Sequence, residues 1–425
     1  MVITMSVRKP EILAPAGDPE KLRAAIAFGA DAVYLAGEMF GMRSAAGNFD
    51  ETELREAVGY AHLKGVKVYV TVNTMPRTGE YGCLEKYLPF LRDIGADALI
   101  ISDLGVLSLA RELVPEVPVH ISTQASVVSA QACLAWHKLG AERIVLAREL
   151  SLDEIREIRE RIPPQLELEV FIHGSMCVAY SGRCLLSNYL TGRDANRGAC
   201  TQPCRWEYKL YTGEIEEVKR PDERFTLIEE AGQTYTFSSR DLCMIDHIPE
   251  LVSAGISSFK IEGRMKSACY AATVTGGYRA ALDRYFADPE GYSADPEWRR
   301  ELEAVCHRQY STGFFFGEAL GAEGICSEPG YIHEQAALAV ALRYDPTAGR
   351  VCFKQKNKFS AGEHVELLMP GRKAYSFVPE RIYDENGSII ESTPHPMMQF
   401  WLEVPFEVPE YSILRYAKSK AFESV

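Results

Sequence analysis

The residues best suited to chemistry are cysteines, and several of them lie in one stretch of the chain. Cys177, Cys184, Cys200 and Cys204 fall within 28 residues, and Cys243 follows after 38 intervening residues. Thiolates bind a zinc ion or an iron–sulfur cluster when flexible backbone lets them converge, and this stretch is rich in glycine. The pattern therefore predicts a metal centre whose ligands are cysteines.

The spacing does not identify the metal. It is neither the paired Cys-x-x-Cys of a zinc ribbon nor a ferredoxin run, so an iron–sulfur cluster, a structural zinc ion and merely buried thiols stay open as interpretations. The chain has 11 cysteines, an odd number, and residues 1–10 contain no apolar core of signal-peptide length. We therefore expect a cytoplasmic protein with free thiols rather than disulfides.

A second set of polar residues stands where predicted strands end. Its members are Asn73, Asp103, Thr123, Gln124, Arg148, Glu149, His173, Lys260, Glu262 and Arg264. In a parallel barrel the carboxyl ends of all strands share one face, so these side chains are expected to form one small-molecule pocket. The alternative, for each residue taken singly, is an ordinary polar strand end.

The residue types indicate roles within this pocket. Four residues are expected to bind a substrate that is an anion, such as a carboxylate or a phosphate: Gln124, Arg148, Lys260 and Arg264. Three residues are the candidates for catalytic proton transfer: Asp103, His173 and Glu262. These roles are hypotheses drawn from strand-end position alone.

The elements that must position these residues alternate between strand and helix from residue 11 onward. Helix starts are marked by Asp18 followed by Pro19, and by a capping box from Asp50 to Glu53. Strands are predicted at 11–15, 31–36, 66–72, 98–102, 117–122, 144–147, 166–173 and 257–261. Eight strand-then-helix units predict an α/β fold, a parallel (β/α)8-like barrel, with an open doubly wound sheet as the alternative.

Two regions do not follow this rhythm. Residues 174–243 form a Cys-rich insertion that is far longer than an ordinary connection between a strand and a helix. Beyond the barrel, residues 287–324 predict a helical linker, and residues 325–425 show short β patterns separated by turns. The expected order is an α/β barrel domain over residues 1–286, the linker, and a small C-terminal all-β barrel domain.

Charge and missing motifs exclude several classes of function. The formal net charge is −13, so nucleic acid would need a local basic patch rather than the whole surface. Candidate patches contain Arg183, Arg193, Arg197, Arg205, Lys354, Lys356 and Lys358. The chain lacks an HExxH motif, a GxSxG elbow and a phosphate-binding GxxxxGK[ST] loop. It also lacks an apolar run long enough to span a membrane.

Several motifs resemble those of the peptidase U32 family. They occupy residues 11–17, 122–124, 169–187, 196–205, 239–243, 260–264 and 307–314, so the resemblance covers most of the chain. The cysteine-bearing motif is the most specific of them. The chain length and the C-terminal β domain are similar to the branch of this family that hydroxylates tRNA.

The resemblance implies an activity and a set of partners. It implies oxygen-independent hydroxylation of the tRNA wobble uridine to 5-hydroxyuridine, with prephenate, a small carboxylate, as the co-substrate. It also implies tRNA as a partner. An electron-donor protein is a further candidate partner, and no membrane association is expected because the chain lacks a long apolar run.

The same resemblance implies a cofactor, a 4Fe-4S cluster. Matching motif to motif places its ligands at Cys177, Cys184, Cys200 and Cys243 and leaves Cys204 as the residue that could exchange with Cys243. Two other functions stay open. One is a collagenase-like endopeptidase that acts through Cys177 or a bound metal, and the other is a non-catalytic accessory factor stabilised by zinc.

Overall fold

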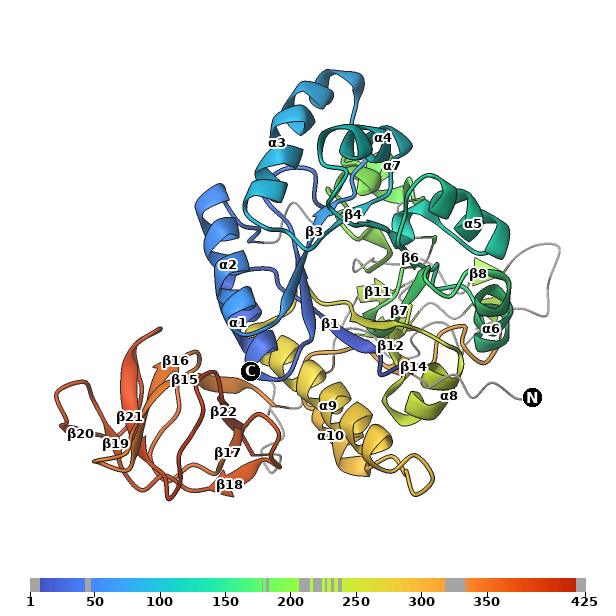
Figure 1. Cartoon of the computed structure of the whole chain (residues 1–425). Helices are drawn as coiled ribbons and strands as arrows, with labels where there is room; N and C mark the ends of the chain where they lie inside the picture. The colour runs from blue at the N-terminus through green and yellow to red at the C-terminus, as the bar shows by residue number, and fades with distance from the viewer. Residues whose placement is uncertain are drawn as a thin grey trace.

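The protein folds into an α/β barrel followed by an all-β domain (Figure 1). A computed structural model describes residues 8–42, 47–177, 179–180, 183–205, 215–216, 224–225, 228–230, 233–235, 239–317, 332 and 335–417. All residues proposed above for the pocket and the metal centre lie within these ranges. Part of the Cys-rich insertion, between residues 206 and 238, lies outside them, as does most of 318–334.

Eight parallel strands close the barrel, as the sequence predicts. They are β1 (Glu11–Pro15), β2 (Ala32–Leu35), β3 (Lys67–Val72), β4 (Ala98–Ile101), β5 (Val119–Ile121), β6 (Arg143–Val145), β7 (Glu167–Ser175) and β13 (Ser258–Ile261). Each strand from β1 to β7 pairs with the next in parallel. The last strand, β13, pairs in parallel with both β7 and β1. This closure confirms the barrel and rules out the open sheet.

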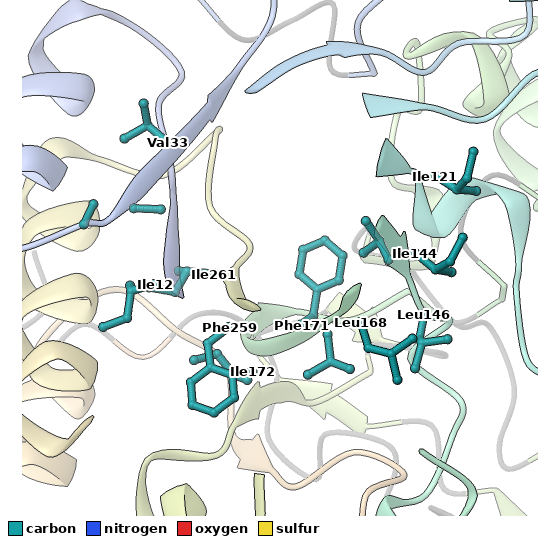
Figure 2. Close-up of a cluster of buried hydrophobic side chains, with 14 of the residues drawn as sticks. Ile12, Val33, Ile121, Ile144, Leu146, Leu168, Phe171, Ile172, Phe259 and Ile261 are labelled. Carbon is teal, nitrogen blue, oxygen red and sulfur yellow. The ribbon is translucent and has the colours of Figure 1, made fainter. Parts of the chain in front are cut away.

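Helices surround the strands and begin at polar caps. They are α1 (Pro19–Ala27), α2 (Glu51–Leu63), α3 (Tyr81–Asp93), α4 (Leu104–Leu113), α5 (Ala130–Lys138), α6 (Leu152–Arg161), α8 (Ile248–Ser253) and α9 (Ala268–Ala287). Asp18 accepts a hydrogen bond from the Lys21 amide, and Asp50 forms the predicted capping box with Glu53. Apolar side chains such as Ile12 and Ile144 fill the layer between strands and helices (Figure 2).

The fifth helix begins later than the sequence suggests. The apolar pattern predicts a helix from residue 126, but residues Thr123–Ala125 form a 3-10 turn and Ser126 adopts a left-handed conformation. The helix starts only after Ser129, whose side chain accepts a hydrogen bond from the Ala132 amide. The N-cap residue Ser129 therefore sets the start of α5. The turn at Thr123–Ala125 stays outside the helix and lies at the barrel mouth.

The insertion after β7 returns to the barrel as an extra strand. Within it lie the short helix α7 (Leu186–Thr191) and the two-stranded pairs β8 (Ile215–Glu216) with β9 (Arg224–Phe225) and β10 (Ile228–Glu230) with β11 (Gln233–Tyr235). Next, β12 (Asp241–Cys243) pairs antiparallel with β7. Beyond α10 (Pro296–Glu303), β14 (Tyr310–Ser311) pairs in parallel with β12. The segment after the barrel therefore also contributes to its sheet.

The C-terminal domain is a curled antiparallel sheet. Its strands are β15 (Ala337–Asp345), β16 (Arg350–Gln355), β17 (Val365–Leu368), β18 (Tyr375–Phe377), β19 (Ile382–Tyr383), β20 (Ile389–Ile390), β21 (Gln399–Glu403) and β22 (Ile413–Tyr416). Their order is β18-β17-β22-β15-β16-β21-β19-β20, and Phe353, Phe359 and Phe400 lie in the core. Within the described residues, no helix is both long and apolar enough to cross a membrane.

Candidate active site at the mouth of the barrel

Polar side chains from several strand ends line a pocket at the mouth of the barrel. The lining residues are Tyr34, Met42, Thr71, Asn73, Ile100, Ser122, Thr123, Gln124, Arg148, Phe171, Lys260, Glu262 and Arg264. The structure therefore brings together the four predicted substrate-binding residues and one predicted catalytic residue, Glu262. The cavity measures about 50 Å³. Small-molecule pockets typically measure roughly 300–1,000 Å³, so a substrate must open this one or lie above it.

Lys260 is held by a buried carboxylate beneath the pocket. Its ammonium lies 2.7 Å from Glu169 Oε1 and 4.6 Å from the centre of the Tyr34 ring. Glu169 is fully buried and also receives a hydrogen bond of 3.1 Å from Arg143 Nη1. Burial alone would raise the pKa of Glu169, but the charges of Lys260 and Arg143 outweigh it and lower that pKa. Lys260 therefore places a fixed positive charge at the pocket, and Glu169 partly neutralises that charge.

Arg264 joins two segments of the pocket wall. Its Nη1 donates to Thr71 Oγ1 at 3.1 Å, and its Nη2 donates to the Met42 carbonyl at 2.5 Å. The side chain also contacts Asn48 Oδ1 at 3.4 Å, and the residue is 3% exposed. Arg264 thus positions the loop after β2 against β3 while its charge faces the pocket.

Arg148 is a pocket cation with a buried donor atom, Nε, that it does not use within the described part of the protein. Its Nη1 donates to the Ser175 carbonyl at 2.6 Å, and its guanidinium lies 4.1 Å from the centre of the Phe171 ring. The Nε of Arg148 is buried and has no hydrogen-bond partner among the described residues. A buried donor without a partner is costly, and an anion in the pocket would satisfy it.

The turn before α5 places Gln124, whose side chain ends in an amide, in the pocket wall. Gln124 lies in this turn, and its backbone amide donates to Ser122 Oγ at 3.3 Å. The same hydroxyl accepts a bond of 3.2 Å from Asn73 Nδ2, and Asn73 Oδ1 accepts from the Met42 amide. Hydrogen bonds among neighbouring strand ends therefore fix the wall around Gln124.

Glu262 carries the carboxylate of the pocket. Its backbone amide donates to the His173 carbonyl at 2.9 Å, and its own carbonyl accepts from Tyr270 Oη at 3.0 Å. Gly174 passes so close that a Cβ there would lie 2.4 Å from the Glu262 carbonyl oxygen, and its φ of +108° also favours glycine. The backbone of Glu262 is therefore clamped while its side chain borders the pocket.

Asp103, proposed above for proton transfer, has a structural task in this fold. It is the N-cap of α4, and its Oδ1 accepts hydrogen bonds from the amides of Gly105 at 2.9 Å and Val106 at 3.1 Å. The same oxygen accepts from Tyr81 Oη at 3.0 Å. Asp103 does not line the pocket, so the structure places it at a helix start rather than with Glu262.

His173, the third residue proposed for proton transfer, lies in a buried aromatic cluster. Its Nδ1 is 3.4 Å from Tyr278 Oη and its Nε2 is 3.3 Å from Tyr310 Oη. Burial lowers the pKa of His173 to about 3, so the ring is neutral at pH 7. It does not line the pocket. Both ring nitrogens face tyrosines, which leaves His173 poorly placed to act as a protease base for Cys177.

The proposed metal ligands are thiols of very different exposure. Cys177 is exposed, Cys184 and Cys200 are half-buried, and Cys243 is buried on β12, opposite His173. Burial raises the pKa of Cys243 to about 11. In the part of the chain that the structure describes, no three Cys, His, Asp or Glu side chains come together as a metal site. The donor chemistry suits a cluster, but the described arrangement does not assemble it.

A loop of the insertion is tied to the barrel mouth. Arg197 forms two bonds to the Glu80 carboxylate, at 2.9 and 2.8 Å, and its Nη1 also donates to the Met75 carbonyl at 3.1 Å. The hydrogen bonds from Arg197 lower the pKa of Glu80 to about 2. The Met75 amide donates to the Asn196 carbonyl at 3.4 Å. The cysteine-bearing segment therefore lies beside the mouth.

Comparison with known proteins identifies the family. Residues 17–323 match Peptidase family U32, and residues 333–415 match the Peptidase family U32 C-terminal domain. The chain belongs to peptidase family U32. The two U32 matches correspond to the α/β barrel and to the all-β domain.

The U32 chain is similar to proteins named for RNA hydroxylation. The tRNA hydroxylation protein P1 of Bacillus subtilis (strain 168) is 39% identical, over 97% of this chain and 96% of that protein. The tRNA hydroxylation protein P of Escherichia coli (strain K12) is 35% identical, over 96% of both chains. The 23S rRNA 5-hydroxycytidine C2501 synthase of the same organism is 36% identical, over 78% of this chain and 48% of that protein.

A network of charged side chains inside this U32 barrel was not predicted from the sequence. Arg143 Nη1 donates to Glu11 Oε1 at 2.6 Å, and its other nitrogens bond Glu167, so a charged network runs below Lys260 and Glu169. The sequence does contain a signal for it. Glu167 and Glu169 alternate with apolar residues at the start of a strand, a spacing that points both side chains to one face.

Proposed function

We propose that this U32 protein hydroxylates tRNA and converts the wobble uridine to 5-hydroxyuridine without molecular oxygen. The observation that carries the proposal is the similarity, over nearly the whole chain, to two proteins named as tRNA hydroxylation proteins. A third relative is named for a 5-hydroxycytidine in 23S rRNA, so all three names concern the hydroxylation of RNA. The activity would take place in the cytoplasm, where tRNA is available.

Prephenate is the co-substrate that we assign to the mouth pocket. Hydroxylation adds an oxygen atom to the pyrimidine and is a two-electron oxidation, so a second reactant or a redox centre has to take part. Prephenate is a dicarboxylate, and the buried Arg148 Nε is a donor suited to a carboxylate oxygen. Glu262 borders the same pocket and is the side chain best placed to exchange a proton with a bound substrate.

A 4Fe-4S cluster is the cofactor in this proposal, with Cys177, Cys184, Cys200 and Cys243 as its ligands. A cluster supplies one-electron chemistry. The pyrimidine loses two electrons on hydroxylation, so prephenate would have to accept them, and an electron-donor protein would serve only to set the resting oxidation state of the cluster. Support comes from the thiol donors and from the position of their loop beside the mouth. Because the described side chains do not converge, binding would require the thiols of Cys177, Cys184 and Cys200 to move toward Cys243.

Anaerobic purification tests the cofactor. We expect a brown protein with visible absorption that dithionite bleaches, and loss of that absorption in serine variants of the four proposed ligands. Cys204→Ser serves as the matched control within the same loop and should retain its iron. A colourless protein with stoichiometric zinc would contradict the cluster and support the structural metal.

Analysis of cellular tRNA tests the reaction. Deletion of the gene should abolish 5-hydroxyuridine at the wobble position, measured by mass spectrometry of digested tRNA, and the wild-type gene should restore it. Unchanged tRNA in the deletion strain would overturn the proposed function.

A pocket variant tests the co-substrate. Arg148→Lys keeps the charge but removes Nε, so the KM for prephenate should rise about tenfold with purified enzyme and tRNA. Arg156→Lys, at an exposed pair with Asp153 on α6, should leave that KM unchanged. An unchanged KM in Arg148→Lys would show that prephenate does not bind beside Arg148.

A further inference from the structure

Helix α7 presents its apolar side to solvent. Leu186, Tyr189 and Leu190 lie at positions i, i+3 and i+4, which places them on one face of the helix. Their exposed fractions are 39%, 80% and 51%, and Leu185 just before the helix is 55% exposed. A surface helix normally buries such a face, so this arrangement is the reverse of the usual one.

The polar side of α7 is the side that packs against the protein. Ser187 is fully buried, and its hydroxyl lies 3.0 Å from Thr201 Oγ1 and accepts from the Thr201 amide at 3.0 Å. Asn188 donates to Asp194, and Thr191 Oγ1 donates to the Ser187 carbonyl at 2.6 Å. The bonds to Thr201 and Asp194 fix the orientation of the helix, so the apolar face is directed outward by specific contacts.

The position of α7 connects this apolar face with the pocket. On the buried side of α7, Asn188 donates a hydrogen bond to Asp194. In the loop that follows, Arg197 contacts Glu80 and the Met75 carbonyl. Met75 lies two residues after Asn73, which lines the pocket. A large substrate that brings one base to the barrel mouth would therefore lie near the segment that contains α7.

The charge of the segment favours a polyanion. Residues 177–205 contain four arginines and one aspartate, with no lysine or glutamate, in a chain of net charge −13. Arg183 and Arg193 flank α7 in sequence and are exposed. Arg183 Nε also contacts Ser126 Oγ at 3.4 Å, beside the turn that carries Gln124. Basic side chains around exposed aromatic and aliphatic ones are typical of surfaces that bind unpaired nucleotides.

We propose that the face formed by Leu186, Tyr189 and Leu190 stacks against unpaired bases of the RNA substrate, next to the base that is modified at the barrel mouth. Arg183 and Arg193 contact the flanking phosphates. The inference rests on the proposed function, since it takes RNA to be the substrate. The apolar face separates the target base from its neighbours, which is how enzymes that modify a base gain access to it.

Binding of an anticodon stem-loop RNA with a wobble uridine tests this inference. In the full-length protein, Tyr189→Ala combined with Leu190→Ala should weaken binding by about tenfold, measured by fluorescence anisotropy, whereas Tyr189→Phe should bind as the wild type. Leu63→Ala is the matched control, because Leu63 on α2 is 86% exposed. A fully paired RNA duplex of equal length should bind all of these proteins alike.

A charge variant tests the phosphate contact. Arg193→Glu should weaken stem-loop binding. It should also make the dependence of log affinity on log salt concentration less steep, by about one. Arg161→Glu, at the exposed end of α6, should change neither. Thermal unfolding and iron content of each variant are measured alongside, because a folding defect would alter these as well.

The outcomes separate this inference from the proposed function. If the wild type binds the stem-loop and the double variant binds it equally well, the role of α7 is overturned and the function stands. If the double variant keeps its RNA affinity but loses turnover with a protein electron donor, α7 docks that protein instead and the inference is again overturned. If the wild type neither binds nor modifies the RNA, both proposals are overturned.

Discussion

At the scale of single residues, the mouth pocket depends on charges that are buried in pairs. Lys260 and Glu169 lie at 2.7 Å with exposed side-chain fractions of 5% and 0%. Arg143 reaches the same carboxylate from the other side. Removing one partner of such a network leaves an uncompensated charge in a medium of low dielectric constant, which costs more than the intact pair contributes.

Glu169→Gln tests this network. The change leaves Lys260 and Arg143 short of one negative charge, so the free energy of unfolding at pH 7 should fall by about 3–5 kcal/mol, measured by urea denaturation. Glu157→Gln, at an exposed pair with Arg161, should change it by less than about 1 kcal/mol. Equal effects of the two changes would contradict the importance of the buried pair.

The same carboxylate predicts a pH dependence. The pKa of Glu169 is lower in the folded protein than its ordinary value of 4.5, so its ionised form stabilises the fold above that pH. This stabilisation is lost as the pH falls from about 4.5 through the folded pKa. Glu169→Gln should therefore lose less stability on acidification than the wild type, as measured by urea denaturation between pH 6 and pH 3.

At the scale of elements, helix caps and strand ends compete for the same polar residues. Asp103 and Glu262 both follow barrel strands, but Asp103 turns back to cap α4 while Glu262 borders the pocket. The difference follows from the distance to the next helix. Asp103 directly precedes α4, whereas α9 begins only after Ser267. Position after a strand is therefore not enough to assign a catalytic role.

Two substitutions at Asp103 distinguish a cap from a catalytic acid. Asparagine accepts the same amide hydrogen bonds, so Asp103→Asn should keep both stability and tRNA hydroxylation. Asp103→Ala should cost about 1 kcal/mol of stability, measured by thermal unfolding, with kcat little changed for the folded enzyme. Loss of kcat in Asp103→Asn with unchanged stability would instead show that the Asp103 carboxylate takes part in the reaction.

At the scale of the whole molecule, ion pairs join the two domains. Arg415 on β22 lies 2.8 Å from Glu301 on α10 and 2.9 Å from Glu366 on β17, and its side chain is 3% exposed. Lys356 on the all-β domain also pairs with Glu20 on α1 at 2.7 Å. These contacts fix the orientation of the all-β domain beside α1 and α10 (Figure 1).

Arg415→Met tests the joint. The change leaves the half-buried carboxylates of Glu301 and Glu366 without their cation. The free energy of unfolding should therefore fall by about 1–3 kcal/mol, and calorimetry should resolve separate transitions for the two domains. Arg161→Met, at an exposed pair on α6, is the control and should keep the wild-type profile. A single unshifted transition in Arg415→Met would show that other contacts hold the domains together.

The order of the barrel strands and seven of the thirteen residues that line the pocket could be predicted from the sequence alone. Asp18, Asp50 and Ser151 mark helix starts locally, and eight alternating units leave a closed barrel as the favoured solution. Because parallel strands share one polar end, Arg148 and Glu262 could be placed together without knowledge of any contact.

Only the tertiary structure decided which way each strand-end side chain turns. His173 is enclosed because Tyr278 of α9 and Tyr310 of β14 lie against its ring, and both tyrosines are far from it in the chain. The outward apolar face of α7 likewise depends on Thr201 and Asp194, which hold its polar side. Local patterns fix where an element begins and which residues share a face, but the partner of each face is set by contacts distant in sequence.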